Sequence, residues 1–148
     1  MAAVSVRRAG PADLGALLPL AQAYCLADRH DFDDERVRGA LDPLLQDDTH
    51  GIVLVAASDR VLVGYAVVTW GYSIESGGPE SLLDEIYVAD PGRGIGSLLV
   101  TACLDAARAH GARTMFLETE AHNEDARRLY ARLGFAVEDS VWMWRALT

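Results

Sequence analysis

The feature that most constrains this chain is a glycine-rich turn between a strand pattern and a helix pattern. The turn is Pro91–Ser97, with glycine at positions 92, 94 and 96. An apolar strand pattern, 82–88, precedes it, and apolar residues recur at helical spacing behind it. A strand that turns through glycines into a helix leaves backbone N–H groups without intrahelical partners, and these groups and the helix dipole favour anions. The sequence therefore predicts a site for a phosphate-bearing ligand.

Two common nucleotide-binding loops are excluded by spacing. A Walker loop requires lysine, and all 13 basic residues of this chain are arginine. A dinucleotide fingerprint requires Gly-x-Gly-x-x-Gly near a first strand, with an acidic residue placed for a ribose further on. Here the spacing is Gly-x-Gly-x-Gly, it comes late in the chain, and no acidic residue is clearly so placed.

Composition indicates one cytoplasmic domain, residues 1–148, without membrane or nucleic-acid partners. No apolar run approaches the about 20 residues of a membrane span, and no signal peptide is present. The net charge of −9 argues against nucleic-acid binding; an acidic surface attracts cationic substrates, although solubility alone also explains it. Cys25 and Cys103 lie in helical patterns, which suits reduced thiols, and no metal-ligand spacing exists.

The order of elements predicts an α/β (α+β) fold, because antiparallel-looking strand pairs come first and strand–helix–strand units later. We expect strands at 4–8, 52–57, 61–68, 82–88, 114–119 and 141–144, and helices at 11–24, 37–45, 94–110 and 124–133. Pro43 kinks or divides the second helix, the segment 71–79 is an irregular loop or a broken strand end, and Gly134 closes the last helix.

Two ordered motifs resemble the GCN5-related N-acetyltransferase (GNAT) family. Leu83–Val88, followed by Gly94–Ser97 and a helix, is similar to the acetyl-CoA-binding motif of that family. Downstream, Asn-x-x-Ala-x-x-Leu-Tyr-x-x-Leu-Gly-Phe over 123–135 is similar to its second motif. The resemblance covers almost the whole chain. It implies the acyl-CoA N-acyltransferase fold, a mixed, mostly antiparallel sheet of about six to seven strands flanked by about four helices.

The resemblance also implies an activity, the transfer of acetyl from acetyl-CoA to the primary amine of a small molecule by direct attack. The main chain of Ile86 and Val88 would pair with the pantetheine arm, and Tyr130 would contact the cofactor and protonate its departing sulfur. Asn123 would cap its helix, bind the cofactor, or both. The turn amides would cradle the pyrophosphate, which assigns to the cofactor Arg93, Gly94, Ile95, Gly96 and Ser97. A helix tyrosine packed under the sheet is the other interpretation of Tyr130.

The glycine turn also departs from the family pattern. Val88 reaches Gly94 two residues sooner than usual, and Pro91 stands where the family has arginine or glutamine. Either Arg93 supplies the missing cation or backbone amides hold the pyrophosphate with less charge assistance. This shortening motivates a second hypothesis, a non-catalytic acyl-CoA sensor of the same fold. A protein or peptide N-acetyltransferase is a third.

The catalytic base is expected among carboxylates on the two strands beside the cleft. Strand alternation sends Asp84 and Glu85 to opposite faces. Asp84 is the first choice, because its position resembles an acidic residue of polyamine-type members, and Glu85 follows. A solvated carboxylate remains the other interpretation of each.

The acceptor amine and the subunit partner are assigned from weaker patterns. Glu118 and Glu120, on one face of the strand at 114–119, would bind a cationic amine or relay its proton through water. Tyr72 and Glu75 would form a wall of the acceptor site. Trp142 and Trp144 alternate on the last strand, which favours core or dimer-interface packing over substrate stacking, and interface packing would imply a homodimer.

Overall fold

The computed structural model describes residues 2–148 of the chain. These residues form two compact units, one ending at Glu118 and the other spanning Thr119–Thr148. Each unit is described by itself. None of the helices in the described residues is long and apolar enough to cross a membrane.

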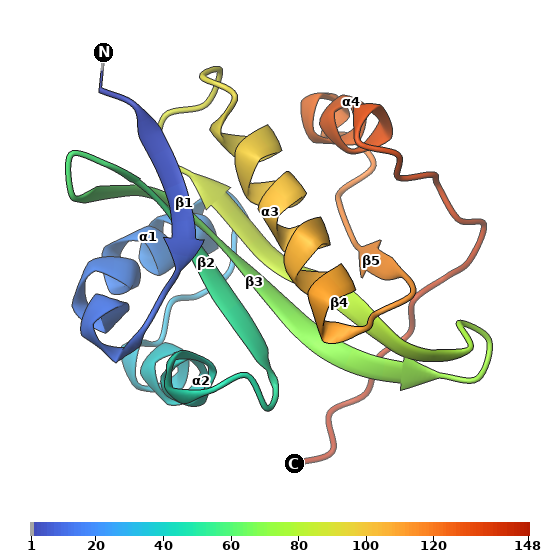
Figure 1. Ribbon diagram of the computed structural model, residues 1–148. Helices are drawn as coiled ribbons and strands as arrows, with labels where there is room; N and C mark the ends of the chain where they lie inside the picture. Colours follow the sequence, from blue (N-terminus) through green and yellow to red (C-terminus); the bar gives the residue numbers. More distant parts are fainter. Residues whose placement is uncertain (1) are drawn as a thin grey trace. The chain divides into compact units, whose positions relative to one another are not determined.

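The first unit is built on a five-stranded sheet whose order follows the chain, β1-β2-β3-β4-β5 (Figure 1). All neighbours are antiparallel except β4 and β5, which are parallel because α3 connects them. The strands are β1 (Val4–Arg8), β2 (Gly51–Ser58), β3 (Val61–Ser73), β4 (Gly78–Val88) and β5 (Met115–Leu117).

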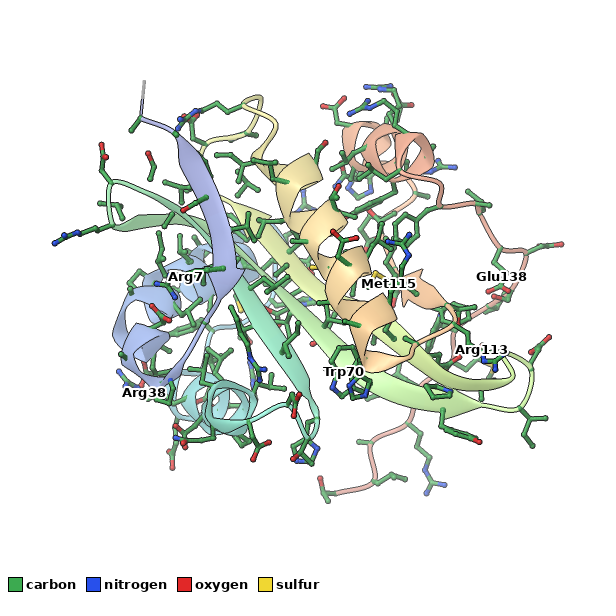
Figure 2. The ribbon with its side chains drawn as sticks, in the orientation of Figure 1. Arg7, Arg38, Trp70, Arg113, Met115 and Glu138 are labelled. Carbon is green, nitrogen blue, oxygen red and sulfur yellow. The ribbon has the colours of Figure 1, made fainter. Side chains whose placement is uncertain are left out.

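Helices cover both faces of this sheet. On one face the core joins α1 (Leu14–Ala27) and α2 (Asp34–Gln46) to the side chains of Tyr65 and Val67 in β3. On the other face lies α3 (Ile95–His110). Gly64 shows how closely α3 approaches, since a Cβ there would meet Leu99 Cδ1 at 3.3 Å and the Tyr87 carbonyl oxygen at 2.8 Å. Figure 2 shows Trp70 of β3 near the C-terminal end of α3, where its ring stacks on His110 at 3.9 Å.

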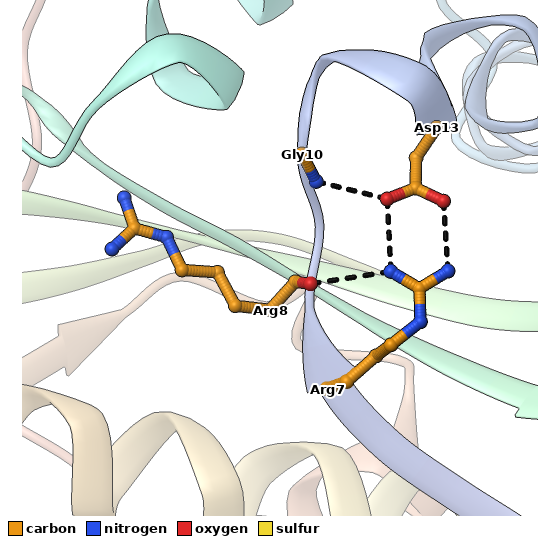
Figure 3. A network of polar contacts seen from close by, with 4 residues as sticks. All are labelled: Arg7, Arg8, Gly10 and Asp13. Atoms are coloured by element: carbon orange, nitrogen blue, oxygen red, sulfur yellow. Dashed lines mark hydrogen bonds and ion pairs between the residues drawn. The ribbon is translucent and has the colours of Figure 1, made fainter.

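The start of α1 is held to β1 by a polar network (Figure 3). Arg7 donates two hydrogen bonds to the Asp13 carboxylate, at 2.9 and 2.8 Å, and the Gly10 amide donates a third at 2.8 Å. The Arg7 guanidinium is the main reason that the pKa of Asp13 falls to about 2. The short 3-10 helix η1 (Pro11–Asp13) thus enters α1 from a fixed point, with proline at its first position as expected.

The second unit contains α4 (Glu124–Arg132), whose two ends form as the sequence predicts. The Asn123 side chain caps the start by accepting a hydrogen bond from the Ala126 amide at 3.3 Å. At the other end Gly134 takes φ +96°, and its amide donates to the Ala131 carbonyl at 3.1 Å. The Phe135 amide donates to the Tyr130 carbonyl at 2.9 Å, and their rings meet edge to face. This pairing is a Schellman motif, which explains the Gly-Phe of the second sequence motif.

The structure differs from the expected elements at three places. The segment 141–144 is not a strand, and Trp142 and Trp144 are 70% and 89% exposed, so the described residues hold five strands rather than six or seven. Alternating apolar residues form a strand only where a partner edge takes up their hydrogen bonds. The segment 71–79, expected as an irregular loop or a broken strand end, belongs to strands at 71–73 and 78–79, because β3 and β4 pair as far as Ser73 and Gly78. Pro43 lies inside an undivided α2.

Candidate functional site

A β-bulge in β4 interrupts the sheet at Asp84. Val67 of β3 pairs with Glu85, while its neighbour Val68 pairs with Leu83, so Asp84 is the extra residue. The bulge reverses the alternation that follows it. Leu83 shares the face of Val68, which packs toward α3, whereas Glu85 shares the face of Val67, which packs toward α1 and α2. Without the bulge, Leu83 and Glu85 would lie on one face.

The bulge also marks where β4 and β5 separate. Their pairing in the described chain ends at Leu83 and Leu117, so β4 continues past β5 from Asp84 to Val88. The Ala89 amide donates to the Val63 carbonyl, which makes Val88 a non-hydrogen-bonded partner of Gly64. Ile86 and Val88 therefore point their N–H and C=O groups away from β3, toward the open edge. The main-chain groups expected to bind a pantetheine arm are at this edge.

The glycine turn follows at once and ends in the first turn of α3. Gly92 and Gly94 adopt left-handed φ values of +90° and +75°, which glycine reaches without steric cost. The first helical hydrogen bond is donated by the Leu98 amide to the Gly94 carbonyl at 3.2 Å. The amides of residues 95–97 therefore have no partner within the helix. A Cβ at Gly92 or Gly94 would meet nothing within 4 Å, so open space lies over the turn, as a pyrophosphate requires.

Arg93 is the only basic side chain of this turn, and it already has a partner. Its Nη1 lies 3.7 Å from Asp90 Oδ2, and the side chain is 26% exposed. Ile95, by contrast, is 1% exposed, so its side chain belongs to the core and only its amide can serve a ligand. A cation is thus present at the turn, but the Asp90 carboxylate three residues away shares it, and its role toward a pyrophosphate remains a prediction.

Glu85 has the most specific environment of the expected acidic residues. Its Oε1 accepts a hydrogen bond from the Tyr65 hydroxyl at 2.7 Å, and Tyr65 is 1% exposed. Burial raises the pKa of Glu85, and the negative charges of Asp84 and Asp28 act in the same direction, while Tyr65 and His30 lower it. A raised pKa suits a general base that must release its proton again near neutral pH.

Strand alternation does not hold between Asp84 and Glu85, so the expectation that it sends them to opposite faces loses its basis. Both carboxylates raise the pKa of Tyr24 in α1, although burial is the larger cause. Burial also raises the pKa of Asp84, even though much of its surface is exposed.

The structure does not bring every expected acceptor residue to this point. Tyr72 pairs with Pro79 at the hairpin end of β4, and Glu75 lies in the turn beyond. Glu85 lies six positions beyond Pro79 along β4, about 20 Å away. Tyr72 is also 78% exposed.

Of the glutamates after β5, Glu118 follows the last paired residue of β5 directly, so it stands across the opening from Asp84 and is exposed. Strand β5 ends at Leu117, so neither Glu118 nor Glu120 lies on a strand as the sequence suggested. Their roles toward an amine remain predictions.

Asn123 and Tyr130 belong to the second unit. The helix cap of Asn123 is confirmed, whereas its contact with a cofactor remains a prediction. Tyr130 is 9% exposed, and its ring centroid lies 5.8 Å from that of Phe135. Its role as the acid stays a prediction as well.

Sequence reasoning missed Tyr65 and Tyr24 as neighbours of the acidic pair. The parity of β3 places Tyr65 on the face of Val67, but only the bulge brings Glu85 to that face. A bulge carries no signal in this sequence. The strand in question, Leu82–Val88, contains neither glycine nor proline.

Comparisons with known proteins agree with this geometry. Residues 17–135 match the model of the Acetyltransferase (GNAT) family. An uncharacterized N-acetyltransferase, YhfO of Bacillus subtilis (strain 168), is 28% identical over 89% of both chains. A mycothiol acetyltransferase of Acidimicrobium ferrooxidans is 41% identical over 62% of this chain and 31% of that protein. Among solved structures, aminoglycoside N-acetyltransferase AAC(6')-Iy in complex with CoA superposes with TM-score 0.86 at 21% identity, covering 100% of this chain and 97% of that one.

The family match spans most of the chain, so the protein belongs to the GNAT family. The expected acyl-CoA N-acyltransferase fold is confirmed, as is the enzyme class, an N-acetyltransferase that uses acetyl-CoA. Within residues 2–148, no group of three or more histidine, cysteine, aspartate or glutamate side chains could hold a metal ion.

Proposed function

We propose that this enzyme transfers the acetyl group of acetyl-CoA to the primary amine of a small cationic molecule, with Glu85 as the base. The observation that carries the proposal is the half-buried carboxylate held by Tyr65 where β4 separates from β5. Acetyl-CoA supplies an activated thioester, and attack by the neutral amine breaks its C–S bond.

The first unit offers groups that suit two parts of acetyl-CoA, its pyrophosphate and its pantetheine arm. The free amides at the start of α3 and the open space over Gly92 and Gly94 suit a pyrophosphate. The outward main-chain groups of Ile86 and Val88 suit the amides of a pantetheine arm, which would pair with them as a further strand does. These groups lead from the turn toward the bulge.

Glu85 is preferred to Asp84 as the base because a hydrogen bond fixes its position. Asp84 sits in the bulge, and no hydrogen bond of its side chain is recorded within the described residues, so we assign it to attracting the amine. The base takes a proton from the attacking nitrogen, directly or through water, and Tyr130 would return one to the departing thiolate. Both acidic side chains lower the local potential, which favours a cationic acceptor.

The relatives support a small-molecule acceptor. AAC(6')-Iy bears the name of an aminoglycoside acetyltransferase, and mycothiol acetyltransferase also acts on a small molecule by its name. We extend this to the present chain as one catalytic domain, residues 1–148, that works in the cytoplasm and forms a homodimer.

The test is an acetylation assay with the wild-type protein. Release of free thiol from acetyl-CoA is followed with spermidine, tobramycin, free amino acids and a hexapeptide as acceptors. We expect turnover with at least one polyamine or aminoglycoside and little with the hexapeptide. Turnover with the peptide alone would replace the proposal by a protein acetyltransferase.

Calorimetry with CoA completes the experiment. Saturable CoA binding without turnover of any amine would contradict the proposal and favour the acyl-CoA sensor. In that case the shortened turn would still bind CoA, and the proposed acetyl transfer to an amine would be wrong.

A further inference from the structure

The Tyr65–Glu85 hydrogen bond is the most deeply placed side-chain contact of the candidate site. It joins two strands at positions 20 residues apart, and the donor is almost fully buried. Burial and the nearby negative charge of Glu85 raise the pKa of Tyr65, so its hydroxyl keeps its proton throughout the working pH range. Tyr65 is therefore a permanent donor, and its only recorded hydrogen-bond partner within the described residues is Glu85.

The other groups that face Glu85 are mostly unfavourable to its charge. Asp84 lies next to it in β4, and Asp28 follows α1; both repel the carboxylate. His30, also after α1, acts in the opposite direction on the pKa of Glu85, and its Nδ1 lies 3.3 Å from Asp28 Oδ2. From α1, Tyr24 and Cys25 face the same carboxylate as neutral groups, since burial and Glu85 raise the pKa of both.

No cation is therefore hydrogen-bonded to Glu85 among the described residues, and the tyrosine hydroxyl performs the task that an arginine performs elsewhere in the chain. The contrast is Asp13, whose carboxylate accepts two hydrogen bonds from Arg7. A neutral donor stabilises the carboxylate without neutralising it. The carboxylate then keeps both its charge and its ability to take a proton.

Resting on the function proposed above, we infer that Tyr65 is a positioning residue of this enzyme: its hydroxyl aims the Glu85 carboxylate at the amine and keeps it ionised. Tyr65 does not touch the substrates. It acts through Glu85 alone, from the buried side of the sheet.

The primary test reads the protonation of Glu85 directly, without any acetylation. Protein labelled with 13C at the glutamate side-chain carboxyl carbon is titrated by NMR, and Glu85→Gln identifies the signal. Tyr65→Phe keeps the ring and removes only the hydroxyl. Because the lost hydrogen bond favoured the charged form, we expect the pKa of Glu85 to rise by about one unit.

A matched control uses the neighbouring tyrosine. Tyr24 lies near the same carboxylate but forms no hydrogen bond to it in the described chain. Tyr24→Phe should therefore leave the titration of Glu85 within a few tenths of a unit of wild type. Equal shifts in Tyr24→Phe and Tyr65→Phe would overturn the inference, since they would indicate a general loosening of the face.

A second measurement protects the test against a variant that does not fold. Biosynthetic replacement of the tyrosines by 3-fluorotyrosine makes each phenol a stronger donor at nearly the same size. We expect the Glu85 titration to move to lower pH. No movement with fluorotyrosine, or no rise in Tyr65→Phe, would show that Tyr65 has only a packing role.

The activity arm uses the amine with the fastest turnover in the acetylation panel. In Tyr65→Phe the acid limb of kcat/KM should move to higher pH by the same amount as the NMR titration, with the KM for acetyl-CoA unchanged. If no amine is turned over, the proposed function fails while the NMR result still decides the role of Tyr65. If turnover occurs and the limb stays fixed, the positioning role fails by itself.

Discussion

The glycine turn and the carboxylate at the bulge lie within one strand–helix unit, yet they are built differently. At the turn, the proposed binding groups are main-chain amides, and their direction follows from two glycines with positive φ and from the start of α3. At the bulge, the proposed base is one side chain, Glu85, and its position depends on Tyr65 of another strand. A site made of main-chain groups can therefore be predicted from a short stretch of sequence, whereas the position of a side-chain group depends on its tertiary neighbours.

The largest effect on activity is expected from a substitution at the bulge. Glu85→Gln removes the base but keeps the side-chain shape, so we expect kcat/KM for the acceptor amine to fall by about 100-fold or more, with the Kd for CoA unchanged. Asp84→Asn should lower kcat/KM by less than about 10-fold. If Asp84→Asn is the more damaging, the base is Asp84 and the bulge serves a different side chain.

Glu85→Gln should also make the folded protein more stable at neutral pH. Burial raises the pKa of Glu85, so the folded state favours its neutral form, and the stability that this group contributes is lost as pH rises through the folded pKa. Glutamine does not ionise, so the variant does not lose stability as the pH rises. We therefore expect its Tm to be about 2 °C higher than that of wild type at pH 7 but not at pH 4. A lower Tm at pH 7 would contradict the raised pKa.

The turn is tested by Gly94→Ala, with a control just beyond the other end of α3. Alanine at φ +75° costs about 1–2 kcal/mol, and its Cβ would also enter the open space over the turn. We expect the Kd for CoA to rise about tenfold or more by calorimetry. Gly111→Ala, at φ +96° beyond the far end of α3, should bring similar backbone strain and leave the Kd unchanged.

A third carboxylate shows what a local partner does. Asp13 is bound by Arg7 only six residues away, and this ion pair lowers its pKa to about 2. The stability from this lowered pKa is present above pH 4 and lost as pH falls toward 2. Asp13→Asn should lower the free energy of unfolding by about 1 kcal/mol at pH 7, measured by urea denaturation. The difference from wild type should vanish below pH 2, and a difference that persists there would point to packing instead.

The smallest expected effect concerns charge at the turn. Asp90→Asn frees Arg93 from its ion pair and removes one negative charge near the pyrophosphate site. We expect the Kd for CoA to fall about two- to threefold at low salt, with a smaller change at 0.5 M salt because exposed charges are screened. Asp59→Asn, in the β2–β3 turn, is the control for net charge. An unchanged Kd in Asp90→Asn would mean that the amides alone determine affinity.

Sequence reasoning predicted the parts of the molecule that short-range geometry controls. The Asn123 cap and the Gly134 termination both form as expected, because each depends on backbone angles and on partners within a few residues. The segment 141–144 shows the limit. Its apolar alternation is typical of a strand, but pairing requires an edge from elsewhere in the chain.

The sequence by itself determined the glycine turn, the two family motifs and therefore the class of enzyme. Only the tertiary structure decided which carboxylate is held by a hydrogen bond from a neighbouring strand. The bulge at Asp84 reverses the face of Glu85 and brings it to the Tyr65 hydroxyl. The physical reason is the range of the forces involved. Glycine φ values and helix caps are local, whereas strand register and the desolvation of a carboxylate depend on everything packed around it.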